Sequence, residues 1–104
     1  MTVVKFDEVI HAVHRLQICG LAAATESIEF GALRDTLKLS DSALSKHLAV
    51  LERASYVLLR RAMAGSRIRT WVSLTAEGRQ ALNGHLAALQ AIAAGRPLLE
   101  PAEE

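Results

Sequence analysis

The middle of the sequence holds five arginines with no acidic residue among them: Arg53, Arg60, Arg61, Arg67 and Arg69. Residues 42–79 carry a net charge of +5, whereas residues 1–41 and 80–104 each carry −2. Guanidinium groups bind phosphate oxygens through charged hydrogen bonds. A basic stretch in a chain of net charge +1 therefore indicates a directed site for a polyanion. An ordinary solvated surface explains the charge count equally well. The choice between the two interpretations depends on the helices and strands that carry these arginines.

Other kinds of chemistry find little support in the residue types. The chain has no glycine-rich phosphate loop, Ser/His/Asp set or paired carboxylates, so we expect no enzyme. The possible metal ligands are His11, His14, Cys19 and His85. There is no Cys-x-Cys pair and no converging set of three ligands, so we expect neither a metal nor a cofactor. Cys19 is the single cysteine, and its apolar surroundings predict a buried, unreactive thiol.

Length and composition indicate one small helical domain. The chain has 104 residues, of which 18 are Ala and four are aromatic, and Ala favours helices because it loses no side-chain entropy there. The first residues lack the basic and apolar regions of a signal peptide. No apolar run approaches the roughly 20 residues that span a bilayer. We therefore expect a cytoplasmic protein without a membrane partner.

The spacing of apolar residues predicts three helices, a hairpin and a fourth helix. The first three helices are expected at residues 7–24, 31–37 and about 41–54, with residues 27–30 as a very short strand or extended segment. Residues 56–61 and 68–74 are β-rich and flank a Gly-Ser turn, which predicts an antiparallel hairpin. Thr75 is expected to cap the last helix, which Gly95 ends, and Ser40 or Ser42 to cap the third.

This order is typical of a winged helix-turn-helix, a mainly α domain with a small β-hairpin (α+β). In such a domain the helix after the tight turn lies in the major groove and the hairpin forms a wing. We expect residues 1–96 to form the DNA-binding domain with terminal dimerisation helices, and residues 97–104 to be disordered.

Leu44, Leu48 and Leu51 form the expected inward stripe of helix 41–54, so the opposite face carries small and polar side chains suited to a groove. The hairpin arginines suit phosphates or a narrow minor groove. For His47, partial burial is at least as good an explanation, and Arg53 and Arg34 are equally explained as surface residues. The candidate DNA-binding residues are Ser42, Ala43, Ser45, Lys46, His47, Ala49, Arg53, Arg60, Arg61, Arg67 and Arg69.

Two motifs resemble those of small winged-helix transcriptional regulators of the MarR/ArsR-like group. Ser45-Lys46-His47-Leu48 followed by Leu51-Glu52 is similar to their recognition-helix signature. Leu74-Thr75-Ala76-Glu77-Gly78-Arg79 looks like their step from wing to last helix, and the match runs from about residue 8 to 93. Ser55 departs from the pattern, which places Gly after the recognition helix. The resemblance implies a homodimeric prokaryotic repressor that binds a pseudo-palindromic operator in double-stranded DNA through a pair of such domains.

The last helix carries more apolar surface than one small domain covers, which agrees with pairing through the terminal helices. The expected dimer interface consists of Val9, Val13, Leu82, Leu86, Leu89 and Ile92. Packing of these leucines against the first helix of the same subunit is the alternative. A different function is also open, namely a winged-helix assembly module without DNA binding, although such a module need not keep Ser, Lys and Arg on these faces. The sequence leaves the existence of a small-molecule effector unknown.

Overall fold

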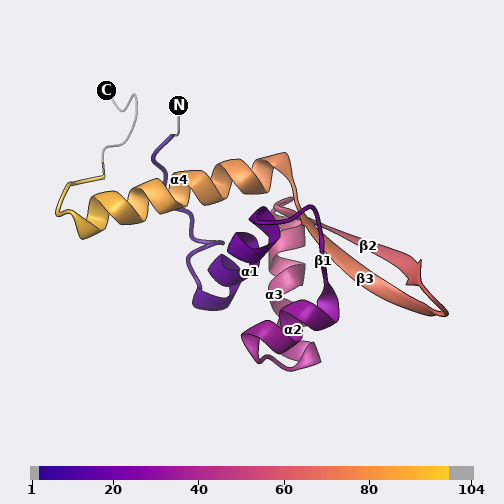
Figure 1. Ribbon diagram of the computed structural model, residues 1–104. Coiled ribbons are helices and arrows are strands. Elements are labelled where there is room, and N and C mark those ends of the chain that lie inside the picture. Colours follow the sequence, from indigo (N-terminus) through magenta and orange to yellow (C-terminus); the bar gives the residue numbers. More distant parts are fainter. Residues whose placement is uncertain (1–2, 99–104) are drawn as a thin grey trace.

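The protein, described by a computed structural model over residues 3–98, has four helices and a three-stranded antiparallel sheet in this range. The elements in chain order are α1 (Val13–Ala23), β1 (Ile28–Glu29), α2 (Phe30–Leu37), α3 (Asp41–Arg53), β2 (Val57–Ala64), β3 (Arg67–Leu74) and α4 (Ala76–Ala93). Strand β3 lies between β1 and β2. The β2–β3 hairpin, called the wing below, projects away from the helices, and α4 extends towards the opposite side (Figure 1). The expected winged helix-turn-helix fold is confirmed.

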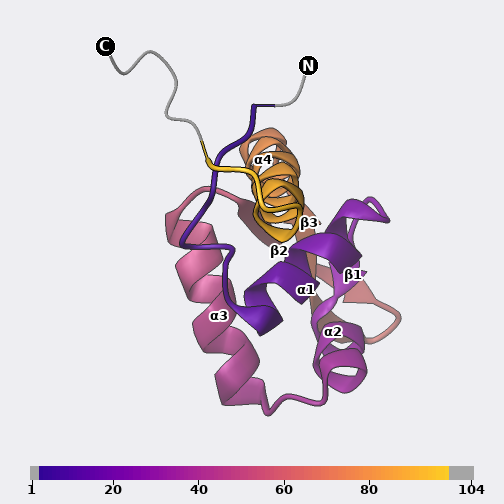
Figure 2. The same cartoon turned by 90° about the vertical axis from the view of Figure 1, so that its left-hand side faces the viewer.

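The turn between α2 and α3 is built from caps at both of its ends. The backbone of Lys38 turns left-handed at φ 56° and ends α2. Ser40 then caps α3, because its Oγ accepts a hydrogen bond from the Ala43 N–H at 3.1 Å. At its other end α2 begins on Glu29, whose carboxylate accepts from the Gly31 N–H at 3.0 Å. These contacts fix the angle at which α3 leaves α2 (Figure 2).

A second corner joins α3, the wing and α4. Ser55 adopts φ 65°, the left-handed conformation for which Gly is favoured after a helix. Thr75 caps α4 by accepting from the Gly78 N–H at 2.9 Å, and its hydroxyl donates to the Ser55 carbonyl at 2.6 Å. A Cβ on Gly78 would overlap the backbone carbonyl of Tyr56, so this close approach requires glycine.

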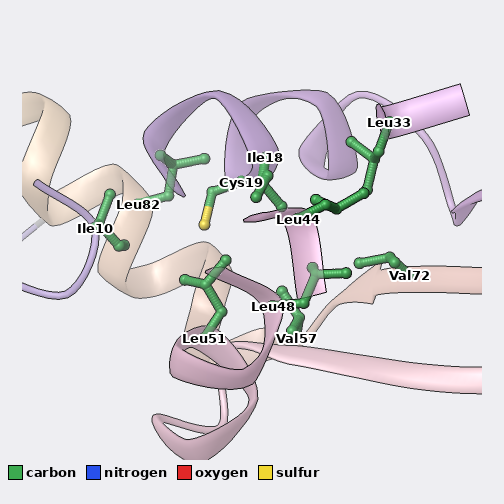
Figure 3. Packing of buried hydrophobic residues seen from close by; sticks show 10 residues of the cluster. All are labelled: Ile10, Ile18, Cys19, Leu33, Leu44, Leu48, Leu51, Val57, Val72 and Leu82. Carbon is green, nitrogen blue, oxygen red and sulfur yellow. The ribbon is translucent and has the colours of Figure 1, made fainter. Parts of the chain in front are cut away.

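One hydrophobic core lies between the helices and the base of the wing (Figure 3). All three leucines of the expected inward stripe of α3 are buried in it. The wing contributes only its base, since the core ends at Val57 and Val72. The cluster consists of Ile10, Ile18, Cys19, Leu33, Leu44, Leu48, Leu51, Val57, Val72 and Leu82.

The first helix is shorter than the apolar spacing predicts. Residues 7–11 form one separate turn, and Ala12 is extended at φ −141° and ψ 134°, so α1 begins at Val13 rather than at residue 7. Val13 is exposed, and the residues that α1 buries are Ile18, Cys19 and Ala22. Val9 and Val13, both expected at the dimer interface, therefore lie on separate segments, because the extended Ala12 divides the turn at residues 7–11 from α1.

The wing is longer than expected. Its strands extend to Ala64 and back from Arg67, so the connection is only Gly65 and Ser66, with Gly65 at φ 67°. Beyond α4, Pro97 and Leu98 are exposed and lie outside any helix or strand, and the rest of the expected disordered tail, residues 99–104, lies outside the described residues. In the range that the structure describes, no helix has the length and apolarity needed to cross a membrane.

Candidate nucleic-acid interface

The outer face of α3 carries small and polar side chains. Ser42, Ser45, Lys46 and Arg53 are exposed, and Ala49 is half-buried. Ser42, Lys46, Ala49 and Arg53 follow one another at spacings of four, three and four residues, which keeps them on one side of a helix. This side lies opposite the buried leucines. Methyl and hydroxyl groups here would let a helix approach base edges closely, with one lysine and one arginine beside them.

Two candidate residues of α3 are not on this outer face. Ala43 is half-buried, and its N–H is used by the Ser40 cap. His47 lies towards α1, where its Nδ1 is 3.3 Å from the Arg15 guanidinium and its ring centroid is 5.5 Å from that of His14. Burial, and then the charge of Arg15, lower the pKa of His47. The structure thus places His47 at the contact between α1 and α3.

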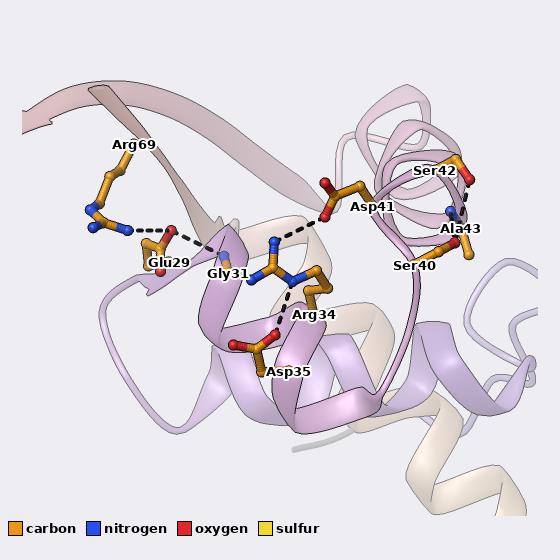
Figure 4. A network of polar contacts seen from close by, with 9 residues as sticks. All are labelled: Glu29, Gly31, Arg34, Asp35, Ser40, Asp41, Ser42, Ala43 and Arg69. Atoms are coloured by element: carbon orange, nitrogen blue, oxygen red, sulfur yellow. Dashed lines mark hydrogen bonds and ion pairs between the residues drawn. The ribbon is translucent and has the colours of Figure 1, made fainter. Parts of the chain in front are cut away.

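An ion-pair bridge ties α2 to the first turn of α3 (Figure 4). The Arg34 guanidinium donates to Asp35 at 2.9 Å and to Asp41 at 3.0 Å. Its hydrogen bond and charge lower the pKa of Asp35. Each exposed pair adds little stability, but the bridge engages Asp41 next to the outer face of α3. The sequence indicates only a surface position or a contact with the DNA backbone for Arg34, because Asp41 is seven positions away.

The arginines of the wing point to both of its faces. The register pairs Arg60 with Trp71, Arg61 with Thr70 and Arg67 with Ala64. Because side chains alternate along a strand, Arg60 and Arg67 share one face and Arg61 lies on the other. All three are exposed and make no ion pair within residues 3–98. Residues 57–74 contain four arginines and no acidic residue, so both faces of the wing are cationic.

Arg69 differs from the other wing arginines. It is half-buried, and its guanidinium lies 3.4 Å from the Glu29 carboxylate (Figure 4). That carboxylate also caps α2 through the Gly31 N–H. The Gly31 N–H, and to a smaller extent Arg69, lower the pKa of Glu29. Glu29 therefore holds the wing against α2 and offsets part of the charge of Arg69.

The proposed dimer residues fall into three groups. Val13, Leu86 and Ile92 are exposed, and Val9 and Leu89 are half-buried. Leu82 is buried in the subunit core. Leu82 therefore does not belong to the expected dimer interface, because its side chain packs inside one subunit.

The candidate metal ligands do not converge. Among the described residues, no group of three or more His, Cys, Asp or Glu side chains is placed to hold a metal ion. Cys19 is fully buried, and burial raises the pKa of its thiol to about 11. This thiol is protonated at neutral pH and therefore unreactive, as expected.

A helix-turn-helix with a small, polar outer face on its second helix, followed by a cationic wing, defines a winged-helix domain. Residues 14–93 match the family of winged helix DNA-binding domains, and the chain belongs to this family. The resemblance to small winged-helix transcriptional regulators is thereby confirmed. The family consists of DNA-binding domains rather than enzymes.

The chain is also similar to individual proteins, two of them transcriptional regulators of known structure. An uncharacterised protein of Methanocaldococcus jannaschii is 29% identical over 79 residues, which cover 76% of this chain and 86% of that protein. The structure is similar to that of a transcriptional regulator homologue from Pyrococcus horikoshii OT3, with a TM-score of 0.80, 27% identity and coverage of 86% and 88% of the two chains. It is also similar to the transcriptional regulator HlyU from Vibrio vulnificus CMCP6, with a TM-score of 0.58, 32% identity and coverage of 79% and 80%.

Proposed function

We propose that this protein is a sequence-specific, double-stranded DNA-binding transcriptional repressor that works in the cytoplasm as a homodimer. The observation that carries the proposal is the outer face of α3, where Ser42, Ser45 and Lys46 are exposed opposite three buried leucines. Such side chains would read base edges in the major groove, because Ser bonds to any base and Lys to the acceptors of guanine. Membership of a DNA-binding family supports this interpretation.

The arginines of the wing would supply affinity rather than sequence choice. Arg60, Arg61 and Arg67 are exposed cations on a hairpin without acids. Contacts of this kind with phosphates orient a protein on the duplex but carry no sequence information. In this arrangement α3 reads base edges, and the arginines of the wing fix the position of the protein along the duplex.

Pairing of two subunits would supply the remaining specificity. One winged helix contacts too few base pairs to single out a site among the roughly 10⁶ or more competitors in a genome. A two-fold axis places two recognition helices about 34 Å apart or at a multiple of that distance, which matches a pseudo-palindromic operator. The exposed Val13, Leu86 and Ile92 of the terminal helices suit a self-complementary apolar interface. Repression is what the resemblance to the small winged-helix regulators implies.

The competing function is an assembly module that binds another protein. The exposed apolar side chains of α1 and α4 would serve this function as well as a dimer. An assembly module would not need the cationic wing or the serine-lined face of α3. We therefore favour DNA binding over protein assembly.

Selection of bound duplexes from a random pool tests the proposal. The enriched sequences should share a motif with two-fold symmetry. Ser45→Ala and Lys46→Ala should relax the preference at particular positions by about 1–3 kcal/mol for each hydrogen bond to a base edge that the substitution removes. Glu77→Ala, at an exposed residue of α4, serves as the control and should keep the wild-type motif. An unenriched pool, or variants of α3 that select the wild-type motif unchanged, would count against DNA readout by this helix.

A further inference from the structure

Two large apolar side chains are exposed near the end of the wing. Met63 of β2 and Ile68 of β3 are exposed to 63% and 61%. They are directly paired in the antiparallel register, so both side chains lie on the same face. On that face the core ends at Val72, four residues along β3 from Ile68. The pair therefore covers no part of the core of its own subunit.

The surroundings of the pair are cationic. Arg61 lies on the same face as Met63, two residues nearer the core along β2, and Arg67 lies beside the turn on the opposite face. No acidic residue occurs from 57 to 74. An apolar pair set among arginines fits a polyanion that also offers apolar surface between its charges. A DNA minor groove has this chemistry, with phosphates along both rims and deoxyribose edges inside.

The width of the wing determines how it would enter that groove. The two-residue turn keeps the end of the hairpin thin, with strands about 4.8 Å apart. The minor groove is about 6 Å wide, so a hairpin with Met and Ile side chains enters only if the groove widens. Inserted apolar side chains unstack base steps and kink the duplex.

The wing also has the necessary reach. Each strand has eight residues, which extend about 26 Å. Only residues 54–56 separate α3 from β2. The minor groove next to a major groove occupied by α3 lies about 17 Å away, half of the helical repeat. The wing is therefore long enough to reach it.

We propose that Met63 and Ile68 form an apolar wedge that enters the minor groove of the bound duplex and bends it. The proposal rests on the DNA-binding function above and adds to it a non-electrostatic contact and a deformation of the DNA. Sequence choice then includes the ease with which base steps under the wing are bent, in addition to the bases that α3 touches.

The test replaces both residues in the full chain, as Met63→Thr with Ile68→Thr, because Thr keeps the preference for a strand. Leu58→Thr is the matched control. Leu58 is exposed to 59% but lies at the base of the wing on the opposite face. The probe is a duplex that the wild-type protein selects from a random pool, with fluorophores at both ends. Affinity is measured over a salt series, and bending is measured by energy transfer between the fluorophores.

The double variant should bind about tenfold more weakly, because less apolar surface is buried against the DNA, and should leave the duplex straighter. The slope of log K against log[salt] should stay at the wild-type value, because both substitutions leave the phosphate-binding arginines in place. Leu58→Thr should bind and bend as the wild type does. Circular dichroism checks that each variant is folded. If the double variant is unfolded, Met63→Thr and Ile68→Thr are measured separately in the same way.

Two outcomes would overturn the wedge. The first is wild-type affinity and bending in the double variant, which would leave salt-dependent DNA binding, and with it the proposed function, intact. The second is that the two substitutions weaken binding of the protein to anionic phosphatidylserine vesicles but change neither its affinity for the duplex nor the bending of the duplex. Failure of the wild-type protein to bind any duplex in a salt-dependent way would instead remove the proposed function, and the wedge with it.

Discussion

Nε2 of His85 lies 3.1 Å from Nδ1 of His11, although 74 positions separate the two residues. His85 is fully buried in α4, and its Nδ1 accepts a hydrogen bond from the Asp7 backbone N–H at 3.0 Å. Phe6 packs against both imidazole rings, with centroids 4.6 and 4.7 Å away. Because Nδ1 of His85 is an acceptor, neutral His85 carries its proton on Nε2 and donates it to His11. The hydrogen bond from the Asp7 N–H holds the segment before α1 on α4 only while Nδ1 of His85 is unprotonated.

Stability should fall in acid because of this arrangement. Burial, and then the charge of His11, lower the pKa of His85, against smaller opposite effects of Asp7 and Glu8. Between this lowered pKa and about 6.5 the unfolded chain binds more protons than the folded one, so the free energy of unfolding rises with pH in this window. The full contribution is present above about pH 6.5 and declines as the pH falls below it. Thermal melting between pH 5 and 8 measures the effect.

His85→Gln keeps a donor and an acceptor but does not titrate, so it should flatten this slope. His47→Gln is the comparison, because the pKa of His47 is also lowered. It should remove a separate part of the slope, so the double variant should have a smaller slope than either single variant. An unchanged slope in His85→Gln would show that the buried His85 does not control acid stability.

Ser55→Gly should stabilise the protein by about 0.5–1 kcal/mol, because Ser55 has φ 65° and only Gly adopts this conformation without strain. The hydrogen bond between Ser55 and Thr75 uses the backbone carbonyl of Ser55 and survives the change. The matched control is Ala54→Gly, since Ala54 has an ordinary φ of −80° and should lose stability. Urea titration measures the free energy of unfolding of both variants. A Ser55→Gly variant less stable than the wild type would contradict backbone strain at Ser55.

Local patterns in the sequence predicted the elements that carry the candidate site. The leucine stripe of α3 and the caps by Ser40 and Thr75 depend on residues at most a few positions apart, which determine helix faces and ends directly. The Gly-Ser turn predicted the hairpin in the same way, although the strands continue further to Ala64 and Arg67.

Long-range partners account for what the sequence did not predict. The break at Ala12 has no Gly or Pro to signal it, and contacts of Asp7 with His85 and with the Tyr56 hydroxyl hold the preceding turn apart from α1. The burial of Leu82 and the pairing of Arg69 with Glu29 likewise depend on residues far away along the chain. Apolar spacing indicates that a face is covered but not whether its own subunit or a second copy covers it.

Arg67→Ala should weaken binding to all duplexes about equally and reduce the salt slope of log K by about one, because the variant binds one phosphate fewer. Arg69→Ala should have a smaller effect on the slope, because Glu29 already offsets part of its charge. Fluorescence anisotropy over a salt series gives both slopes. An affinity that does not respond to salt would contradict phosphate binding by the wing.

Leu86→Glu should yield folded monomers that lose specific DNA binding. Leu86 is exposed on α4, so a carboxylate there costs the subunit little, whereas in an apolar two-fold interface it is an unpaired buried charge. Leu82→Glu is the contrasting variant and should unfold the protein, because Leu82 lies in the core. Light scattering with circular dichroism distinguishes these outcomes. A Leu86→Glu protein that stays dimeric would place the interface elsewhere.

Directed cleavage of DNA from α3 tests the central claim, that two copies of this helix lie on one duplex. The variant Glu52→Cys places a thiol on the exposed edge of α3, beside its outer face, for attachment of an iron chelate that cleaves nearby DNA. The native Cys19 is buried and its thiol pKa is raised to about 11, so labelling is confined to position 52. On a duplex selected by the protein, we expect two cleavage clusters related by two-fold symmetry and centred about 10 base pairs, or a multiple of that, apart. Uniform cleavage, or cleavage no stronger than that by the free chelate, would contradict the placement of α3 on DNA.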